Sequence, residues 1–319
     1  MSDVNICILG AGGQLGSKLV HKFSNNKKIN VYAVDKFFKY KYSNVSYVDL
    51  DVKNDFDNRF EIIPNQSTVF IDCIGLQHSF LSKKIMFVNY ELNKKLFDYI
   101  RYHYKDFHFI YISSLSVDYG ENKKLYPGVG KPINIYGKSK LQFENYLYEN
   151  KNDDFRSTII RPAAFYDKDV SKNLFNFFDL LINKIFILPR KKIKRSFLSL
   201  EYFADFLEEY ILNGETKSLF ELGDKNPIEF RSLINFIKNL NLNTTSKIFF
   251  IPTFLFKIAG YIGFLFEKLG LHIGFLTILG EFGYSFVASN DVKLNQREKH
   301  DTYENFENII MKLFNSAEE

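Results

Sequence analysis

The sequence predicts an α/β protein built on a doubly wound parallel sheet, followed by a smaller, mostly helical C-terminal lobe. Up to residue 161, short apolar runs alternate with segments of helical periodicity, which is the order of parallel strands joined by crossover helices. The first apolar run, residues 6–9, leads through a glycine-rich turn into a helical segment. Beyond Pro162 the pattern becomes mostly helical.

The first part is expected to contain six strands and three principal helices. Six strands with helical crossovers favour a doubly wound sheet over other α/β arrangements. The expected strands are residues 4–9, 29–34, 45–48, 68–73, 107–112 and 156–161, and the expected helices are residues 14–24, 84–104 and 136–149. We expect this first domain to span residues 1–165.

The second part, residues 166–319, is expected to form a cap, some segments of which can return to the sheet. Two short apolar runs, Leu219 to Leu222 and Lys247 to Ile251, are expected to be isolated strands. Pro252 suits the start of a helix because its missing N–H has no helical partner there. The expected cap helices are residues 172–185, 200–213, 229–240 and 253–268.

Composition predicts a globular protein and argues against nucleic-acid binding. The chain of 319 residues is 46% hydrophobic and 17% aromatic, and its net charge of +5 is spread along the sequence. Cys7 and Cys73 each lie in an apolar run, so we expect buried core residues and neither a disulfide nor a metal site.

The N-terminus and the longest apolar region indicate where the protein resides. The N-terminus enters a strand without a signal-peptide pattern, which predicts a cytoplasmic protein. Residues 254–286 are strongly apolar, but charged residues interrupt them before the ~20 residues that a spanning helix needs. Packing within the cap and at a subunit interface is favoured over a peripheral membrane contact for this segment.

The glycine-rich turn predicts a dinucleotide site. Gly10, Gly13 and Gly16 occur where a strand passes into a helix, and Gln14 and Leu15 begin that helix. Glycine permits the tight turn, and the backbone N–H groups of a helix N-terminus can bind a pyrophosphate.

Asp35 ends the next expected strand, about twenty residues further on. A carboxylate there can accept hydrogen bonds from ribose hydroxyls and disfavours a 2′-phosphate, so NAD is expected rather than NADP. Lys36 next to it weakens that preference. Asp49 and Leu50, at the end of the third expected strand, are candidates to contact adenine, and Asp51 is the alternative.

Tyr136 and Lys140 are four residues apart on an expected helix and therefore share one face. A phenol beside an ammonium can transfer protons, because a nearby positive charge stabilises the phenolate. Beside a dinucleotide site, this pair indicates redox chemistry.

These features resemble the extended short-chain dehydrogenase/reductase family, and within it the NAD-dependent nucleoside-diphosphate-sugar epimerases and dehydratases. The resemblance rests on the glycine spacing, the strand end at Phe109 to Ser114 and the Tyr136 to Lys140 pair. It implies a Rossmann sheet, Tyr136 as the acid/base, and Lys140 as the group that lowers the tyrosine pKa and binds the nicotinamide ribose. Ser114 is the expected catalytic hydroxyl, with Ser116 as its rival.

The same resemblance assigns further residues. Asn89 is expected to bind the cofactor and support the active site, and Gly75 is expected to allow close approach of the cofactor, while an ordinary helix residue and a loop glycine are the alternatives. Asn173 and Arg195 correspond to residues that bind the substrate diphosphate, although the basic run around Arg195 could instead be a solvated loop. A homodimer through the helices at 84–104 and 136–149 is expected by analogy.

The sequence leaves three functions open. Dehydratases of the family carry an acidic pair where this chain has Leu115 and Ser116, so dehydration is disfavoured. The favoured function is an NAD-dependent 4-epimerase of a UDP-hexose or UDP-N-acetylhexosamine, expected to serve surface polysaccharide synthesis. The alternatives are a reductase of nucleotide 4-keto sugars and a non-catalytic NAD(P)-binding subunit. No metal is expected.

Overall fold

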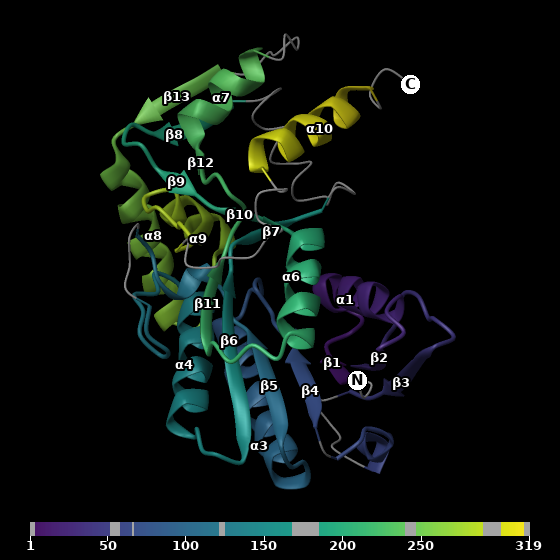
Figure 1. Ribbon diagram of the computed structural model, residues 1–319. Coiled ribbons are helices and arrows are strands. Elements are labelled where there is room, and N and C mark those ends of the chain that lie inside the picture. The colour runs from purple at the N-terminus through teal and green to yellow at the C-terminus, as the bar shows by residue number, and fades with distance from the viewer. Residues whose placement is uncertain are drawn as a thin grey trace.

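The computed structural model describes residues 4–51, 58–65, 67–120, 125–167, 185–239, 247–289 and 301–315. A seven-stranded sheet forms the centre of this part of the chain (Figure 1). All its strand pairs are parallel, in the order β3-β2-β1-β4-β5-β6-β11. The strands are β1 (Val4–Leu9), β2 (Ile29–Asp35), β3 (Val45–Asp49), β4 (Thr68–Asp72), β5 (Phe107–Ile112), β6 (Phe155–Pro162) and β11 (Leu219–Leu222). The predicted fold class is confirmed, and each end of the six expected strands falls within one residue of its predicted place.

The seventh strand corrects one prediction. Leu219 to Leu222 was expected to be an isolated strand, but β11 pairs with β6 from Leu219 beside Ile159 to Leu222 beside Pro162. The four residues of β11 are all buried, as a strand inside a covered sheet requires. This strand is a segment of the C-terminal part that returns to the sheet, as was allowed for, but an apolar run of this length does not indicate which strand it pairs with.

Helices cover both faces of the sheet (Figure 1). Ile6 and Ile8 of β1 share a core with the buried residues of α1 (Gln14–Ser24) and α6 (Leu200–Leu212). The alternate residues, Cys7 and Leu9, pack with α3 (Asn93–His103) and α4 (Ile135–Glu149) on the other face. Successive residues of the strand therefore face opposite sides of the sheet, and each side is covered by helices, as in a doubly wound sheet. Cys7 is a buried free thiol, and Cys73 is a half-buried free thiol.

The helix expected at 84–104 is interrupted by a π-helical turn. It consists of α2 (Ser82–Met86), the π-helical segment η2 (Phe87–Leu92) and α3. A π-turn is rare and occurs most often at functional sites. Short 3₁₀ turns lie at η1 (Asn58–Ile62) and η3 (Leu115–Val117).

The C-terminal part combines helices with three small two-stranded sheets. Helices expected at 200–213, 229–240 and 253–268 are confirmed as α6, α7 (Phe230–Asn239) and α8 (Thr253–Lys268). Two further helices, α9 (Gly274–Glu281) and α10 (Thr302–Asn315), were not predicted. The pairs are β7 (Ala164–Tyr166) with β10 (Phe197–Ser199), β9 (Lys194–Arg195) with β12 (Ile228–Glu229), and β8 (Ile185–Pro189) with β13 (Lys247–Ile251).

Two further expectations for this part need correction. The strand at Lys247 to Ile251 is not isolated, because β13 pairs in parallel with β8. The helix expected at 172–185 lies outside the described residues except for Ile185, which begins β8 and is therefore not helical. Among the helices described, none has the length and apolar character needed to cross a membrane.

Candidate active site

The glycine turn joins β1 closely to α1. Gly10 has a φ of +80°, which favours glycine, and a Cβ at Gly16 would lie 2.2 Å from the carbonyl oxygen of Gly10. Gly12, which the motif did not single out, has no room for a side chain either, because its Cβ would lie 1.8 Å from the carbonyl oxygen of Phe37. The turn therefore presents backbone at the carboxyl edge of the sheet.

Asp35 lies at the end of β2 and faces this turn. One carboxylate oxygen accepts a hydrogen bond from the Gly12 N–H at 2.9 Å, and the other accepts from the Lys36 N–H at 2.7 Å. Each oxygen can accept a further bond, so the carboxylate is fixed and still able to bind a hydroxyl. Of the two adenine candidates, Asp49 is exposed, whereas the side chain of Leu50 is buried in the core and leaves only its backbone for a ligand.

Lys140 reaches the same edge from α4. Its ammonium donates hydrogen bonds to the carbonyl oxygen of Ile112 at 2.9 Å and, more weakly, to that of Ile74 at 3.4 Å. Only 3% of the residue is exposed. Burial lowers the pKa of Lys140 to about 8, and the nearby Asp72 carboxylate opposes that shift. A Cβ at Gly75 would lie 3.3 Å from the Lys140 nitrogen, so glycine keeps the space beside the ammonium open.

Asp72 is a site residue that the sequence reasoning missed. It ends β4, is fully buried, and accepts a hydrogen bond from the Ile74 N–H at 2.9 Å with one oxygen. The other oxygen has no partner among the described residues. Burial raises the pKa of Asp72 to about 6, while the Lys140 charge lowers it. The carboxylate therefore supplies the negative charge that keeps the buried ammonium protonated.

Tyr136 lies one helical turn before Lys140 and is half-buried, and its phenol lies close enough to Ser114 for that side chain to affect its pKa. Burial raises the pKa of Tyr136 to about 12, the neighbouring Ser114 side chain lowers it, and the Glu281 carboxylate raises it. We expected Lys140 to lower this pKa. The Lys140 ammonium donates to two carbonyl oxygens, and the phenol has its pKa well above neutral pH.

The neighbouring serines have distinct partners. Ser113 donates to the Glu144 carboxylate at 2.5 Å, whereas the Ser114 oxygen accepts the Ser116 N–H at 3.1 Å. Gly137 explains how the phenol reaches Ser114, since a Cβ there would lie 2.1 Å from the Ser116 carbonyl oxygen. The contact to Tyr136 favours Ser114 over Ser116.

Asn89 lies in the π-turn, where it fixes the loop after β4. Its amide group exchanges two hydrogen bonds with the backbone of Leu76, at 2.7 and 3.0 Å, and donates to the Ser139 hydroxyl at 2.9 Å. Ser139 in turn donates to the Tyr136 carbonyl oxygen. Because both amide hydrogens are engaged, Asn89 positions the loop and α4 rather than offering a free donor to a ligand.

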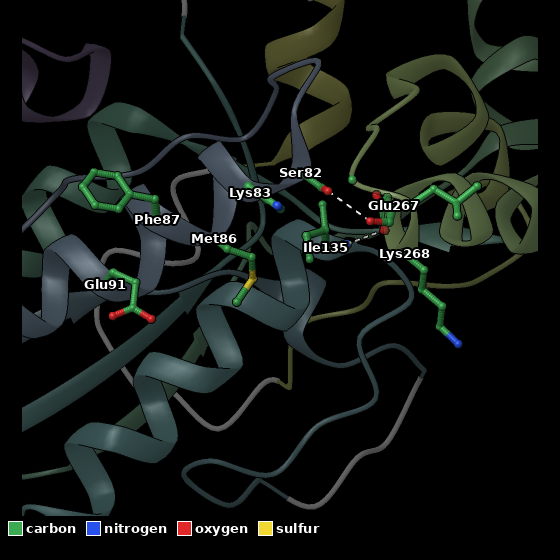
Figure 2. Close-up of a pocket in the computed structure, with 10 residues that line it drawn as sticks. Ser82, Lys83, Met86, Phe87, Glu91, Ile135, Glu267 and Lys268 are labelled. Atoms are coloured by element: carbon green, nitrogen blue, oxygen red, sulfur yellow. Dashed lines mark hydrogen bonds between the residues drawn. The ribbon is translucent and has the colours of Figure 1, made fainter.

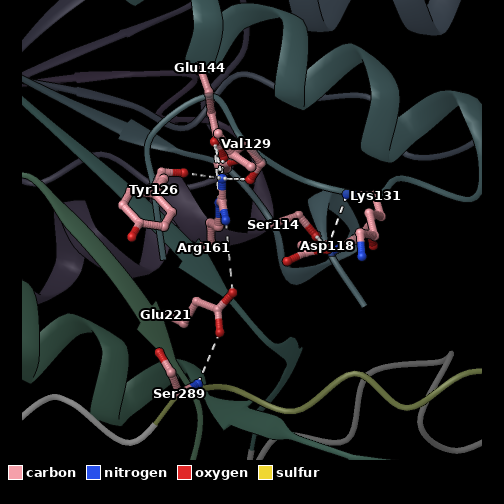
Figure 3. Close-up of polar contacts among 11 residues, drawn as sticks. Ser114, Asp118, Tyr126, Val129, Lys131, Glu144, Arg161, Glu221 and Ser289 are labelled. Atoms are coloured by element: carbon pink, nitrogen blue, oxygen red, sulfur yellow. Dashed lines mark hydrogen bonds and ion pairs between the residues drawn. The ribbon is translucent and has the colours of Figure 1, made fainter. Parts of the chain in front are cut away.

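An ion network joins α4 to the sheet (Figure 3). The Arg161 guanidinium of β6 binds the Glu144 carboxylate of α4, and also the backbone oxygens of Tyr126 and Val129. Glu221 of β11 lies 4.0 Å from the other side of Arg161. Both acids and Arg161 are buried, so removal of one partner would leave an uncompensated charge.

Two carboxylates of the C-terminal part hold the first turn of α4. Glu267 of α8 accepts the Ile135 N–H at 2.9 Å, and Glu281 of α9 accepts from the Asn134 amide at 2.9 Å. Asn134 caps the helix by accepting the Gly137 N–H at 2.8 Å. The turn that carries Tyr136 is thus fixed by residues more than 130 positions later in the chain.

A surface cavity opens beside Glu267 (Figure 2). None of the predicted catalytic, cofactor or substrate residues lines it. It is lined by Ser82, Lys83, Met86, Phe87, Glu91, Ile135, Glu267, Lys268, Leu269 and Gly270. The cavity is therefore distinct from the candidate active site, although Glu267 links the two through Ile135.

Arg195, in β9, binds the carboxylate of Glu281, which also holds Asn134. One terminal nitrogen of its guanidinium donates to Glu281 at 3.1 Å, and the rings of Phe282 and Phe286 lie 5.6 and 5.1 Å from the guanidinium carbon. Its Nε and second terminal nitrogen are buried without hydrogen-bond partners in the described part of the chain. Arg195 therefore retains donors for an anion. Asn173 lies outside the described residues.

Residues 6–187 match the NAD dependent epimerase/dehydratase family. Since the match covers more than half of the 319 residues, the chain belongs to this family of enzymes, whose cofactor is NAD. The predicted family and cofactor are confirmed at this level. Among the described residues, no group of three or more His, Cys, Asp or Glu side chains could hold a metal ion.

The individual proteins that resemble this chain have low sequence identity to it. The chain is 27% identical over 158 residues to an ADP-L-glycero-D-manno-heptose-6-epimerase of Alkalilimnicola ehrlichii, which aligns 46% of this chain and spans about half, 48%, of that protein. The Helicobacter pylori enzyme of the same name has a TM-score of 0.65 at 15% identity, covering 98% of this chain and 97% of its own. UDP-glucuronic acid 4-epimerase of Bacillus cereus, solved with NAD, has a TM-score of 0.63 at 17% identity, covering 78% and 86%. The structural likenesses show the fold.

The Glu267 contact gives a testable prediction. Glu267→Ala removes the acceptor for the Ile135 N–H and for the buried His272 ring, which should lower the free energy of unfolding by about 2–3 kcal/mol. Glu267→Gln keeps an acceptor and should lose less. Urea denaturation measures both, with the exposed Glu307→Ala as control. If Glu267→Ala and Glu307→Ala unfold at the same urea concentration, Glu267 does not hold α4.

Proposed function

We propose that this protein is a nucleotide-sugar epimerase that oxidises and then reduces one carbon of its substrate, most specifically the 4-carbon of a UDP-hexose or UDP-N-acetylhexosamine. The observation that carries the proposal is the contact between the Tyr136 phenol and the Ser114 hydroxyl, one helical turn from the buried ammonium of Lys140. Together these three groups can bind a sugar oxygen and move its proton.

The residues at the carboxyl edge of the sheet fit NAD. The Gly10–Gly16 turn and the start of α1, with Gln14 and Leu15, would hold the pyrophosphate, and Asp35 would hold the adenosine ribose. Lys140 would bind the second ribose beside Gly75, where a side chain would crowd the ammonium. When bound, NAD supplies the hydride acceptor and a positive charge.

Tyr136 would hold or release one proton at its phenol oxygen. It accepts the proton of the sugar hydroxyl as the carbon is oxidised and returns it when the carbon is reduced, so the cycle has no net proton change. A phenol with a pKa of about 12 is almost wholly protonated at neutral pH, so the neighbouring Ser114 side chain and added positive charge are needed to stabilise the phenolate.

Arg195 would bind the substrate diphosphate. A guanidinium can donate two parallel hydrogen bonds to phosphate oxygens, and Arg195 has two buried nitrogens without partners in the described residues. Glu281 holds Arg195 and the first turn of α4 at once. The phosphate group and the reacting hydroxyl would therefore be held by connected residues. Asn173 remains the second proposed ligand.

Epimerisation is preferred to net reduction because Asp35 suits NAD retained through one turnover. Leu115, where dehydratases of the family carry an acid, is apolar and buried. A second candidate is 6-epimerisation of an ADP-heptose, favoured by the likeness to the Helicobacter pylori enzyme over 98% of the chain. A role in surface polysaccharide synthesis, a homodimer and a cytoplasmic location are parts of the same proposal.

The test is product analysis with purified protein, UDP-sugars and ADP-heptose, without added reduced cofactor. Wild-type protein should form the isomer, and Tyr136→Phe should be slower by about 100-fold or more because general acid–base catalysis contributes about 10² to 10⁴. Tyr146→Phe, on the same helix but bonded to Asp98, should retain activity.

Other outcomes would redirect the proposal. Consumption of added NADH or NADPH with a 4-keto sugar would indicate a reductase. Retained NAD with no turnover would indicate a non-catalytic binder. Full activity of Tyr136→Phe would remove the catalytic assignment altogether.

Arg195 gives an independent prediction that needs no turnover. Arg195→Met should weaken UDP or ADP binding by about 10- to 100-fold, since hydrogen bonds to charged groups contribute roughly 1.5–3 kcal/mol. Calorimetric titration with each nucleotide measures the affinity and identifies the preferred base. The exposed Arg231→Met is the matched control. Equal affinity of Arg195→Met and wild type would mean that the diphosphate binds elsewhere.

A further inference from the structure

Helix α8 has its apolar face turned away from the protein. A surface helix normally buries its apolar stripe. Here Phe256, Gly263 and Glu267 are the buried positions of α8. The exposed apolar residues repeat every three or four positions, as one face of a helix does, and they are Phe254, Leu255, Ile258, Tyr261, Ile262 and Leu265, continued by Leu269. We call these seven residues the outer stripe.

Neighbouring elements extend the outer stripe. Phe275 and Ile278 of α9 are exposed, as is Phe249 of β13. The helices α8 and α9 touch at their backbones, because a Cβ at Gly260 would lie 2.8 Å from the Gly280 Cα. Such close contact packs the two helices tightly against each other as one hairpin. A large apolar surface of this kind usually marks an interaction site.

The exposed charges on α8 and beside its first residues are positive. Exposed Arg190, Lys191 and Lys192 adjoin the start of α8, since the Lys191 N–H donates to the Thr253 hydroxyl at 3.1 Å. Lys257 and Lys268 are exposed on the helix itself.

The acidic side chains of α8 and α9 lie on the side of the hairpin opposite the outer stripe. Across α8 and α9 the acidic residues are Glu267 and Glu281, whose carboxylates bind Ile135, Asn134 and Arg195 on the inner side. The outer side of the hairpin is therefore apolar and positively charged.

We propose that the outer stripe docks this protein onto an anionic phospholipid bilayer, with α8 lying in the plane of the interface. Apolar side chains enter the headgroup boundary while lysine and arginine contact acidic lipids, as in interfacial helices. A second copy of the chain fits less well, because it would bring lysines against lysines. Docking would leave the inner contacts of Glu267 and Glu281 with α4 intact, and it does not rest on the proposed catalytic function.

Vesicle sedimentation tests this with the full chain. Vesicles of phosphatidylcholine alone and of phosphatidylcholine with 30% phosphatidylglycerol are compared at low and high salt. Wild type should bind the anionic vesicles at least ~10-fold more tightly, and salt should weaken that binding. The triple variant Phe254→Ser, Ile258→Ser, Leu265→Ser should lose binding to both. Lys191→Glu with Lys192→Glu should lose only the preference for anionic vesicles.

The matched control is Ile62→Ser with Met311→Ser, two exposed apolar residues on η1 and α10, which should bind as wild type. All substituted side chains are exposed, so each variant should remain folded. Thermal unfolding of each variant checks this. Equal binding by the triple variant and wild type would overturn the proposal, as would no wild-type binding to anionic vesicles. A concentration-dependent dimer that the triple variant abolishes, without vesicle binding, would assign the outer stripe to a second copy.

Discussion

The buried ammonium of Lys140 is the constraint on which the rest of the site depends. A positive charge at the carboxyl edge of a parallel sheet is stable only with oxygen acceptors and a negative neighbour, which Ile112, Ile74 and Asp72 supply. To reach those acceptors, α4 must pass close to the end of β5. That position brings Tyr136, one turn earlier, against Ser114.

Helix α4 is held at its side and at its start. Glu144 binds Arg161 of the sheet, and Ser139 binds Asn89 of the π-turn. The first turn is held by Glu267 and Glu281, which belong to the C-terminal hairpin. Folding of the distant hairpin and geometry of the phenol are therefore coupled. Glu281 extends this coupling to Arg195, the proposed phosphate ligand.

Much of the fold and of the candidate site could be predicted from the sequence, and the features that were not predicted have a common cause. Strand periodicity, the Gly10 to Gly16 turn and the Tyr136 to Lys140 spacing are local signals, and they predicted the sheet and family correctly. Asp72, Glu267 and Glu281 reach the site from separate elements, so no spacing identified them, and the β6–β11 pairing was missed for the same reason. The tyrosine pKa depends on burial, which a motif does not report. The roles of the site residues, the homodimer and the cytoplasmic location stay predictions.

The most direct test of the account is the pKa of Lys140 in the purified protein without substrate. Lysine labelled with ¹³C at Cε can be titrated by NMR, and Lys140→Met assigns the resonance. The account predicts one lysine that titrates near pH 8, cationic below and neutral above that value, and that disappears in Lys140→Met. Titration of every lysine at the ordinary value of about 10.4 would contradict the account, because burial of this ammonium would then not outweigh the attraction of the Asp72 carboxylate.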